Sequence, residues 1–218
     1  MSQDPFGVVF YFIVTLWLAR MWWRDYREAQ DSNKGTYERG LPGATPCTLK
    51  PIFIAVAGTL LLLAAETYGE IRLGISAEQS DVSCFFLLAL ISAAIAEEFI
   101  FRGFLVIETR GEAAKWISVF VFSTIFALIH PYLWSFEWND ESTAGTLTKI
   151  VQAFDLNITL KAVFTTVFIF VGSLWFYAVR FFRWNPRHSI LVPIAAHLVK
   201  NIAVFLIKLA QGHVTSIF

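Results

Sequence analysis

Charged residues are scarce in this chain of 218 amino acids. Only 16% of the chain is Asp, Glu, Lys or Arg, against about 25% in soluble domains. Hydrophobic residues make up 56% and aromatic residues 17%, and the mean hydropathy is +0.59. This composition indicates a membrane protein. The formal net charge is zero, so no overall electric field favours a nucleic acid or an acidic partner.

Cysteine is nearly absent as well. The two cysteines, Cys47 and Cys84, belong to no metal-binding or redox motif, which excludes a disulfide-rich fold. The topology derived below puts them on opposite sides of the membrane, so we expect free thiols. The N-terminal segment Met-Ser-Gln-Asp-Pro lacks the basic residues that begin a signal peptide, so we expect the first apolar run to be retained.

Long apolar runs are abundant by contrast. A bilayer core is crossed by about 20 mostly apolar helical residues. Six stretches approach that length, and they are Phe6–Trp23, Pro51–Tyr68, Cys84–Ile107, Trp116–Trp134, Leu160–Val179 and Ile190–Leu209. They predict an all-α fold, a polytopic transmembrane helix bundle that forms a single domain over residues 1–218. The segments 20–50 and 135–157 are predicted to be polar loops.

The basic residues alternate between the loops. The loops after the first, third and fifth spans carry Arg20, Arg24, Arg27, Lys34, Arg39, Lys50, Arg110, Lys115, Arg180, Arg183 and Arg187. The loops after the second and fourth spans carry only Arg72 and Lys149. Because cytoplasmic loops collect Lys and Arg, this alternation predicts that both termini lie outside and that the basic loops lie in the cytoplasm.

Three spans contain polar clusters that a purely structural helix would avoid. Those clusters are Glu97-Glu98-Phe99-Ile100-Phe101-Arg102 in the third span, Phe126-Ala127-Leu128-Ile129-His130 at the end of the fourth, and His197-Leu198-Val199-Lys200-Asn201 in the sixth. An ionisable residue inside the membrane is costly and faces the bundle interior or a water-filled cavity. Each cluster is therefore a candidate functional site.

The spacings within two clusters place polar groups on common helix faces. Glu98 and Arg102 are four residues apart, so they can form a charge pair. Glu97 is rotated by about 100° from Glu98 and can point towards another helix. His197 and Asn201 are also four apart, and both can donate hydrogen bonds to one ligand atom.

These groups suffice for peptide hydrolysis in a water-accessible cavity. Glu97 can act as a general base, and His130 can share or orient the attacking water. His197 and Asn201 can stabilise the oxyanion that forms at the scissile carbonyl.

A structural alternative is that such residues hold helices together. Glu–Arg and His–Asn pairs also serve as hydrogen-bonded contacts between membrane helices. Glu66 and Glu70, at the end of the second span, are interpreted as interfacial charges. Lys200 is expected to extend to the interface or to pair with a neighbour.

The ordered set of motifs resembles a known family. The motifs are Glu97-Glu98-x-x-x-Arg102, Phe126-x-x-x-His130 and His197-x-x-x-Asn201, all within residues 84–209. Together they are similar to those of the CAAX protease and bacteriocin-processing family. That family includes the type II CAAX prenyl endopeptidases and the bacterial Abi proteins.

The resemblance implies an intramembrane glutamate protease. By motif position, Glu97 and His130 would activate the water, and His197 and Asn201 would form the oxyanion site. Glu98 and Arg102 would support the first motif. Family members have been described both as metalloproteases and as metal-independent enzymes. Zinc held by Glu97, His130 and His197 is possible from the ligand types, but there is no His-Glu-x-x-His motif, and the metal-free form without a cofactor is favoured.

The resemblance also implies partners and a location. We expect contact with membrane lipid and a membrane-associated or prenylated peptide or protein substrate, no nucleic acid, and residence in a prokaryotic plasma membrane. Two other functions remain open. One is a proton- or ion-coupled transporter, because Glu, His and Arg inside spans also form proton relays. The other is a non-catalytic immunity or scaffold protein.

Overall fold

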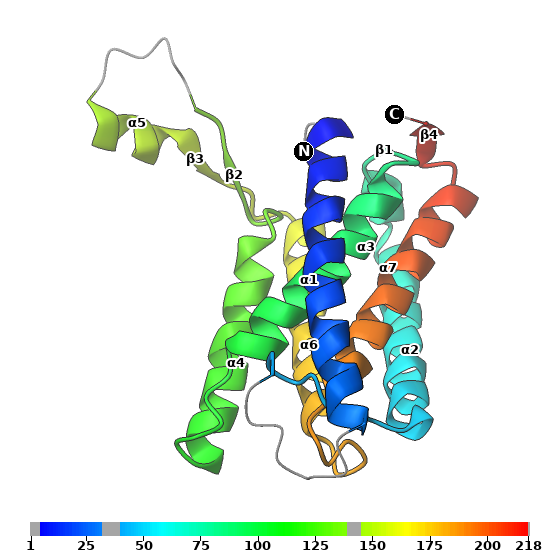
Figure 1. The fold of residues 1–218 in the computed structure, drawn as a ribbon. Helices are drawn as coiled ribbons and strands as arrows, with labels where there is room; N and C mark the ends of the chain where they lie inside the picture. The colour runs from blue at the N-terminus through cyan, green and yellow to red at the C-terminus, as the bar shows by residue number, and fades with distance from the viewer. Residues whose placement is uncertain (1–4, 32–39, 139–144, 218) are drawn as a thin grey trace.

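A computed structural model of the chain describes residues 5–31, 40–138 and 145–217. In chain order its elements are α1 (Pro5–Asp31), α2 (Leu49–Leu73), the 3₁₀-helix η1 (Ser76–Glu78), β1 (Val82–Ser83), α3 (Phe86–Glu97), the π-helix η2 (Glu98–Phe104), α4 (Glu112–Ile129), β2 (Trp134–Phe136), α5 (Thr146–Ala153), β3 (Phe154–Leu156), α6 (Leu160–Phe181), α7 (Leu191–Ala210) and β4 (Val214–Ser216). The long helices run up and down in one bundle, with both ends of the chain at the same end (Figure 1).

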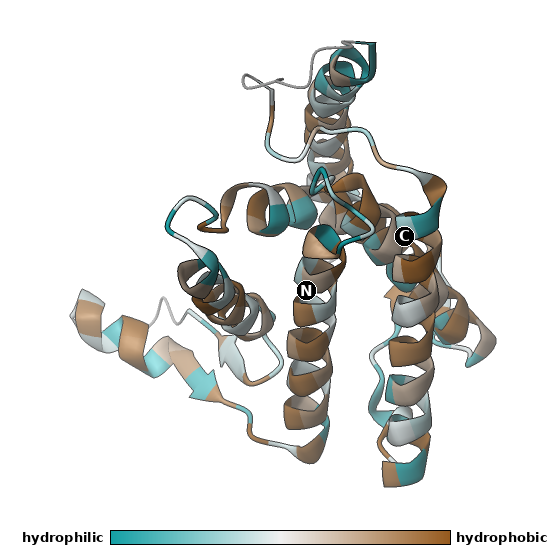
Figure 2. Ribbon diagram, turned by 90° about the horizontal axis from the view of Figure 1, so that it is seen from below, coloured by the Kyte–Doolittle hydropathy of each residue, from teal (hydrophilic) through white to brown (hydrophobic). Residues whose placement is uncertain are grey.

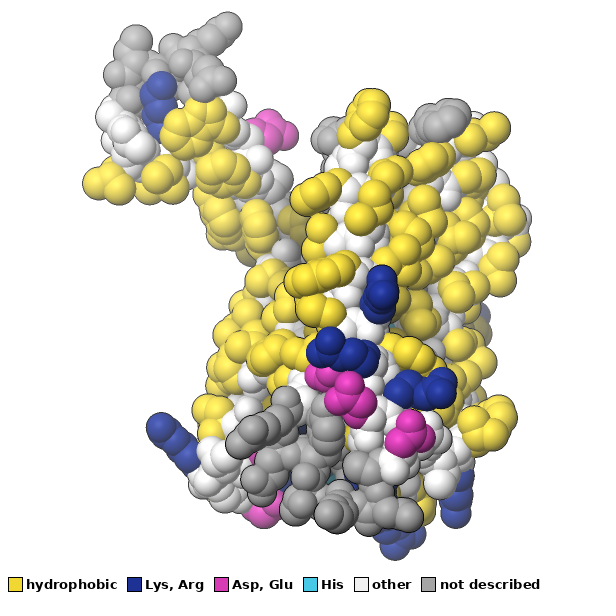
Figure 3. Space-filling model, in the orientation of Figure 1, with side chains coloured by type: hydrophobic (Ala, Val, Ile, Leu, Met, Phe, Trp, Pro, Cys, Tyr) yellow, Lys and Arg dark blue, Asp and Glu magenta, His cyan; other side chains and the backbone are white. Residues whose placement is uncertain are grey.

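Apolar side chains cover the outside of this bundle. Five helices of the described residues, α1, α2, α4, α6 and α7, are long and apolar enough to cross a membrane. Brown hydrophobic residues extend along the helices (Figure 2), and yellow side chains cover most of the face seen in Figure 3. On the bundle in that view, Lys and Arg side chains lie from the middle towards the end opposite the two termini, and Lys or Arg is also seen on the arm. The predicted all-α polytopic bundle is confirmed, and its basic loops lie at one end, as expected.

The third predicted span is not one continuous α-helix. The α-helix stops at Glu97 and continues as the π-helix η2. The Leu105 amide donates to the carbonyl of Ile100, five residues earlier, over 2.8 Å. The wider π-turn is frequent at functional sites, and here it coincides with the charged residues of the first motif. The third predicted span, Cys84–Ile107, therefore consists of an α-helix followed by a π-helix and is not one regular α-helix.

Two helix ends also differ from the sequence prediction. Helix α1 continues beyond Trp23 to Asp31, because its polar last turns pack onto the bundle instead of starting a loop. Helix α4 ends at Ile129, five residues before the predicted end at Trp134. Pro131 disfavours the helical conformation of the residue before it, and the Trp134 indole Nε1 donates to the free carbonyl of Leu128 over 2.6 Å. Lys34 and Arg39, assigned to the first basic loop, lie outside the described residues.

The segment predicted as a polar loop over 135–157 contains an arm that leaves the bundle. Strands β2 and β3 pair antiparallel, with Trp134 opposite Leu156, and α5 precedes β3. The arm projects sideways, and α5 lies level with the outer ends of α1 and α7 (Figure 1). The periodic apolar residues Leu147, Ile150 and Val151 are all exposed, and Figure 3 shows hydrophobic side chains along the lower side of the arm.

We expect this arm to rest on the membrane surface. Leu147 and Lys149 lie on opposite sides of α5 because they are two residues apart in a helix. An amphipathic helix at this level buries its apolar face at the boundary of headgroups and acyl chains. A fluorophore attached to Leu147→Cys should be quenched by lipids with brominated acyl chains, and one on Lys149→Cys should be quenched less. Equal quenching at the two positions would show that the arm does not lie on the bilayer.

Helices α2 and α6 approach closely at a glycine. The Trp175 indole Nε1 lies over α2 and donates to the Ala55 carbonyl and the Thr59 hydroxyl, at 3.2 Å and 3.0 Å. A Cβ atom added to Gly58 would lie 2.1 Å from the Trp175 ring. Small residues allow such approaches between membrane helices.

Gly58→Ala should therefore destabilise the bundle. Overpacking of a close contact costs about 1–3 kcal/mol, which thermal unfolding in detergent can detect as a lower midpoint. Gly145→Ala is the matched control, because a Cβ atom there meets nothing within 4 Å. Equal midpoints for the two variants would contradict the close packing of α2 on α6.

Candidate active site

Two charged residues of the first motif, Glu98 and Arg102, are fully buried in the site. Glu98 begins η2 and Arg102 lies one turn further, and both side chains are 0% exposed. The Arg102 Nη1 atom is 3.1 Å from Glu98 Oε1, so the charge pair predicted from the spacing is present. Fully buried charges are tolerated in a protein only when they are paired and hydrogen bonded. Because both residues belong to η2, the pair itself lies within this element, and the contacts of its members with α6 and α7 hold η2 in the bundle.

A histidine of α7 joins this pair to Glu97. The His197 Nδ1 atom is 2.8 Å from Glu98 Oε1, and its Nε2 atom is 3.9 Å from Glu97 Oε2. Its ring stacks on Phe176 of α6, with centroids 4.8 Å apart. Because Glu98 accepts at Nδ1, the Nε2 atom is the one that faces Glu97. The Glu97 side chain is 23% exposed, so it can meet a substrate or water while Glu98 cannot.

Helix α6 completes the surroundings of Arg102. The guanidinium donates to the Ser173 hydroxyl over 2.7 Å and to the Ser173 carbonyl over 3.1 Å. Ser173 in turn donates to the Ser123 hydroxyl of α4 over 3.1 Å. Aromatic rings flank the guanidinium, with Phe126 at 4.6 Å and Tyr177 at 4.8 Å. Four elements, η2, α4, α6 and α7, thus converge on the Glu98–Arg102 pair.

The structure places His130 at the edge of the cluster. His130 directly follows α4 and its Nδ1 atom is 2.7 Å from the Phe126 carbonyl, which can only accept, so Nδ1 donates. The Phe126 ring lies next to both histidines, with its centroid 4.9 Å from the His130 ring and 6.4 Å from the His197 ring. Within the described residues no hydrogen bond or ion pair joins His130 to Glu97.

Asn201 lies one turn along α7 from His197. Its amide nitrogen donates to the Leu90 carbonyl of α3 over 2.9 Å. The same amide retains a second N–H and a carbonyl oxygen for a further partner. The shared face of His197 and Asn201 agrees with the spacing prediction, while the contact with Leu90 was not predicted.

A second buried arginine was misassigned from the sequence. Arg180 was counted among the basic residues of a cytoplasmic turn, yet its side chain is 4% exposed. It donates to the Arg102 carbonyl and, over 2.6 Å, to Glu108 Oε1. Outside the spans, the hydrogen bond from His188 and the Arg180 charge hold the pKa of Glu108 below its ordinary value, against the effect of burial. Polar contacts from α6 and its following turn therefore surround Arg102 and Glu108, whereas α7 contacts Glu98 at the start of η2.

Tyr11 of α1 is another residue that sequence reasoning missed. It lies close enough to Glu97 for an electrostatic interaction. A tyrosine in an apolar span gave no signal in the sequence, because interfacial and core tyrosines have the same pattern.

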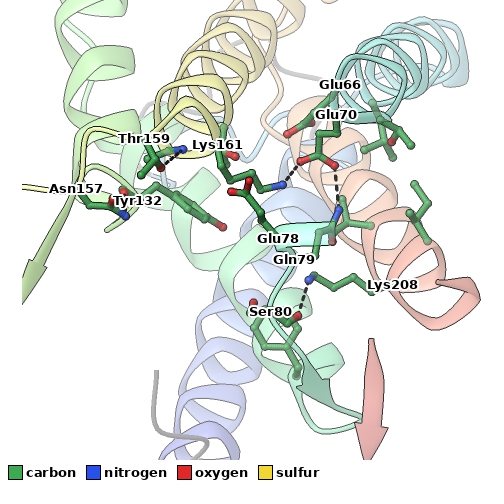
Figure 4. Close-up of a pocket in the computed structure, with 17 residues that line it drawn as sticks. Glu66, Glu70, Glu78, Gln79, Ser80, Tyr132, Asn157, Thr159, Lys161 and Lys208 are labelled. Carbon is green, nitrogen blue, oxygen red and sulfur yellow. Dashed lines mark hydrogen bonds and ion pairs between the residues drawn. The ribbon is translucent and has the colours of Figure 1, made fainter. Parts of the chain in front are cut away.

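Glu66 and Glu70 are not simple interfacial charges, which corrects their sequence assignment. Glu70 pairs with Lys161 and accepts from Gln79 over 2.9 Å, and Glu66 lies 3.6 Å from Lys200. Both carboxylates face the bundle interior, because the helices α6 and α7 place lysines opposite them. Figure 4 shows Glu70 and Lys161 pointing into a common cavity.

The three residues considered as zinc ligands are not assembled for that role. Within the described ranges, no group of three or more His, Cys, Asp or Glu is placed to hold a metal ion. The donor set does not fit the zinc site, and no step below depends on a metal.

Comparison with known proteins identifies a family. The model of the family described as "Type II CAAX prenyl endopeptidase Rce1-like" matches residues 79–203, which is more than half of the chain. No curated protein and no solved structure matched. The matched range runs from the residue after η1 into α7 and includes all three motifs. The chain is therefore an integral membrane protein that belongs to the Rce1-like family of type II CAAX prenyl endopeptidases.

Proposed function

We propose that this protein is an intramembrane endopeptidase that uses Glu97 to activate water and acts on a membrane-associated or prenylated peptide. Membership of the family supports a CAAX-type endopeptidase at the level of the family. The observation that carries the residue assignment is the chain from Glu97 through His197 to Glu98 and Arg102. It contains one partly exposed carboxylate, held beside a buried and fixed ion pair. We infer a prokaryotic plasma membrane from the resemblance to bacterial family members.

The proposed reaction needs one base that later acts as an acid. The Glu97 carboxylate takes a proton from water while the water oxygen bonds to the scissile carbonyl carbon. When the tetrahedral intermediate collapses, the carbon–nitrogen bond breaks and Glu97 returns the proton to the leaving amine. One water is consumed, and the products are a new carboxylate and a new amine. His130, whose Nδ1 is bound to Phe126, offers Nε2 to orient the water.

The oxyanion formed in this reaction needs donors on the opposite side. The second N–H of Asn201 can donate, as can His197 Nε2 when the ring is protonated. Glu98 supports this role because it accepts from Nδ1 and fixes the ring orientation. Arg102 acts on the reaction only through Glu98, so both are positioning residues.

A transporter is the second candidate, because the pairs Glu70–Lys161 and Glu66–Lys200 lie inside the bundle. Ionisable pairs in spans also form proton relays. Proton flux across vesicles that contain the protein, measured with a pH-sensitive dye, tests this alternative. The transporter would be favoured if the wild type showed proton flux without peptide cleavage and Glu66→Gln lost that flux.

The proposed function is tested with the purified full chain in lipid nanodiscs. Matched peptides with and without a prenylated cysteine are incubated with the protein, and the products are identified by mass spectrometry. We expect cleavage at one bond, with the prenylated peptide preferred. Cleavage should be unchanged by a zinc chelator, because the residues considered as ligands are not gathered. If the chelator abolished cleavage and added zinc restored it, the metal-free mechanism would be overturned. If folded protein cleaved none of the peptides, the peptidase function would be overturned.

A further inference from the structure

The outer end of the bundle contains a cavity separate from the group formed by Glu97, Glu98, Arg102 and His197, which we call the acid cluster. Its volume is about 470 Å³, within the range of about 300–1,000 Å³ that ligand pockets occupy. Its walls come from α2, η1, α6, α7 and the segment after α4 (Figure 4). These are the parts of α2, α6 and α7 that lie at the same end as both termini. Neither Glu97 nor His197 lines it.

Charged groups make this cavity hydrophilic although it lies among membrane helices. The Glu70–Lys161 pair lines one wall, and Lys208 Nζ donates to the Ser80 carbonyl over 2.8 Å at the mouth. Tyr132 belongs to the segment after α4, where burial and the charges of Glu66 and Glu70 raise its pKa. Charged side chains at this depth face water-filled cavities. The cavity is therefore a hydrated space.

Polar groups continue from the cavity towards the acid cluster along α2 and α7. Glu66 is one turn below Glu70 on α2, four residues away, and its carboxylate lies 3.6 Å from Lys200 Nζ. Lys200 is three residues from His197 on α7, so both face the same side of that helix. The Glu66–Lys200 pair thus lies between the cavity and His197.

Helix α6 leaves room beside this ion pair. A Cβ atom added to Gly172 would lie in ordinary van der Waals contact with Lys200 Nζ, at 3.6 Å, so Gly172 faces this ion pair. The next residue, Ser173, binds Arg102 of the acid cluster. The adjacent residues Gly172 and Ser173 therefore lie next to the Glu66–Lys200 pair and the Glu98–Arg102 pair, respectively.

We propose that this cavity and the Glu66–Lys200 pair form an access path by which water reaches Glu97 from the outer end of the bundle. The ligand of the path is water, of which the hydrolysis consumes one molecule per cycle. The Glu66–Lys200 pair keeps the narrow part hydrated, because its charges favour water over an apolar contact. The catalytic use of this water rests on the proposed function, in which Glu97 is the base.

Cysteine labelling in oriented vesicles tests the path without needing cleavage. In a Cys47→Ser/Cys84→Ser background, Thr165→Cys places a thiol in the cavity wall and Gly172→Cys places one next to Lys200 of the ion pair. Val167→Cys is the control, because Val167 is on the same helix but faces lipid with 51% exposure. A charged, membrane-impermeant thiosulfonate is added on the side of the chain termini.

We expect Thr165→Cys and Gly172→Cys to be labelled and Val167→Cys to be protected. Replacement of the ion pair by Glu66→Leu/Lys200→Leu should abolish labelling of Gly172→Cys while leaving that of Thr165→Cys. The polar double variant Glu66→Gln/Lys200→Gln should retain both, and it also shows whether loss of the charges alone impairs folding. The proposed path would be overturned if Thr165→Cys were not labelled. It would also be overturned if Gly172→Cys were labelled to the same extent with and without Glu66→Leu/Lys200→Leu.

The catalytic use of the path has its own readout. Glu66→Leu/Lys200→Leu should lower kcat by about tenfold or more, with KM unchanged, since water activation and not substrate binding is impaired. An unchanged kcat together with lost labelling would show that water reaches Glu97 another way. Cleavage that survives Glu97→Gln would reject the proposed function, whereas the labelling results would still report whether the path is hydrated.

Discussion

Glu97→Gln should lower kcat about 100- to 10,000-fold, the range that a general base contributes, with little change in the thermal unfolding midpoint. Glutamine has the same shape as glutamate but cannot accept the proton of water. Glu97 is only partly buried, and among the described residues its side chain approaches no Lys, Arg or His within 4 Å except His197 at 3.9 Å, so the substitution breaks no close ion pair. The measurement is the initial rate of peptide cleavage over a range of substrate concentrations.

The matched control is Glu112→Gln at the start of α4. Glu112 is an exposed acid outside the three motifs, paired with Lys115. It should retain full cleavage. Equal activities of Glu97→Gln and the wild type would show that another group is the base. A Glu97→Gln variant that fails to fold would instead assign this carboxylate to the structure, which the unfolding midpoint reports directly.

The sequence predicted the parts of the site that depend on spacing within one helix. Glu98 and Arg102 form their pair, and His197 and Asn201 share a face of α7, because residues four apart in a helix are neighbours. The composition and the apolar runs also predicted the bundle, since the thickness of a bilayer sets the length of a span.

Contacts between distant segments could not be predicted in this way. Single-helix spacing does not tell that Ser173 binds Arg102, or that Lys200 meets Glu66. Arg180 was misassigned because its position near a span end satisfies the rule for basic loops, while its partners, the Arg102 carbonyl and Glu108, lie more than 70 residues earlier. The π-helix has no signature in the sequence apart from the polar residues it carries.

The arm was missed for a different reason. Polar and apolar residues alternate over too short a range in 135–157 to distinguish a loop from a hairpin with one short helix. Its apolar face becomes visible only when β2 and β3 pair and bring the exposed residues to one side.

Arg102→Met should destabilise the protein by about 3–5 kcal/mol, the cost of leaving one buried charge without its partner. Glu98 is 0% exposed, and after this change only His197 would contact its carboxylate among the described residues. Thermal unfolding in detergent should show a much lower midpoint. Arg110→Met, in the exposed loop before α4, removes a charge of the same kind and should leave the midpoint unchanged.

The double variant Glu98→Gln/Arg102→Met separates the cost of an unpaired charge from the loss of packing. Replacement of both residues leaves neither charge of this pair without its partner, so we expect part of the stability lost in Arg102→Met to return. Cleavage should nevertheless remain low, because a neutral amide holds His197 less firmly than the carboxylate that now accepts from Nδ1 at 2.8 Å. Recovery of both stability and activity would mean that the pair only fills space, and the role of Glu98 in orienting His197 would be wrong.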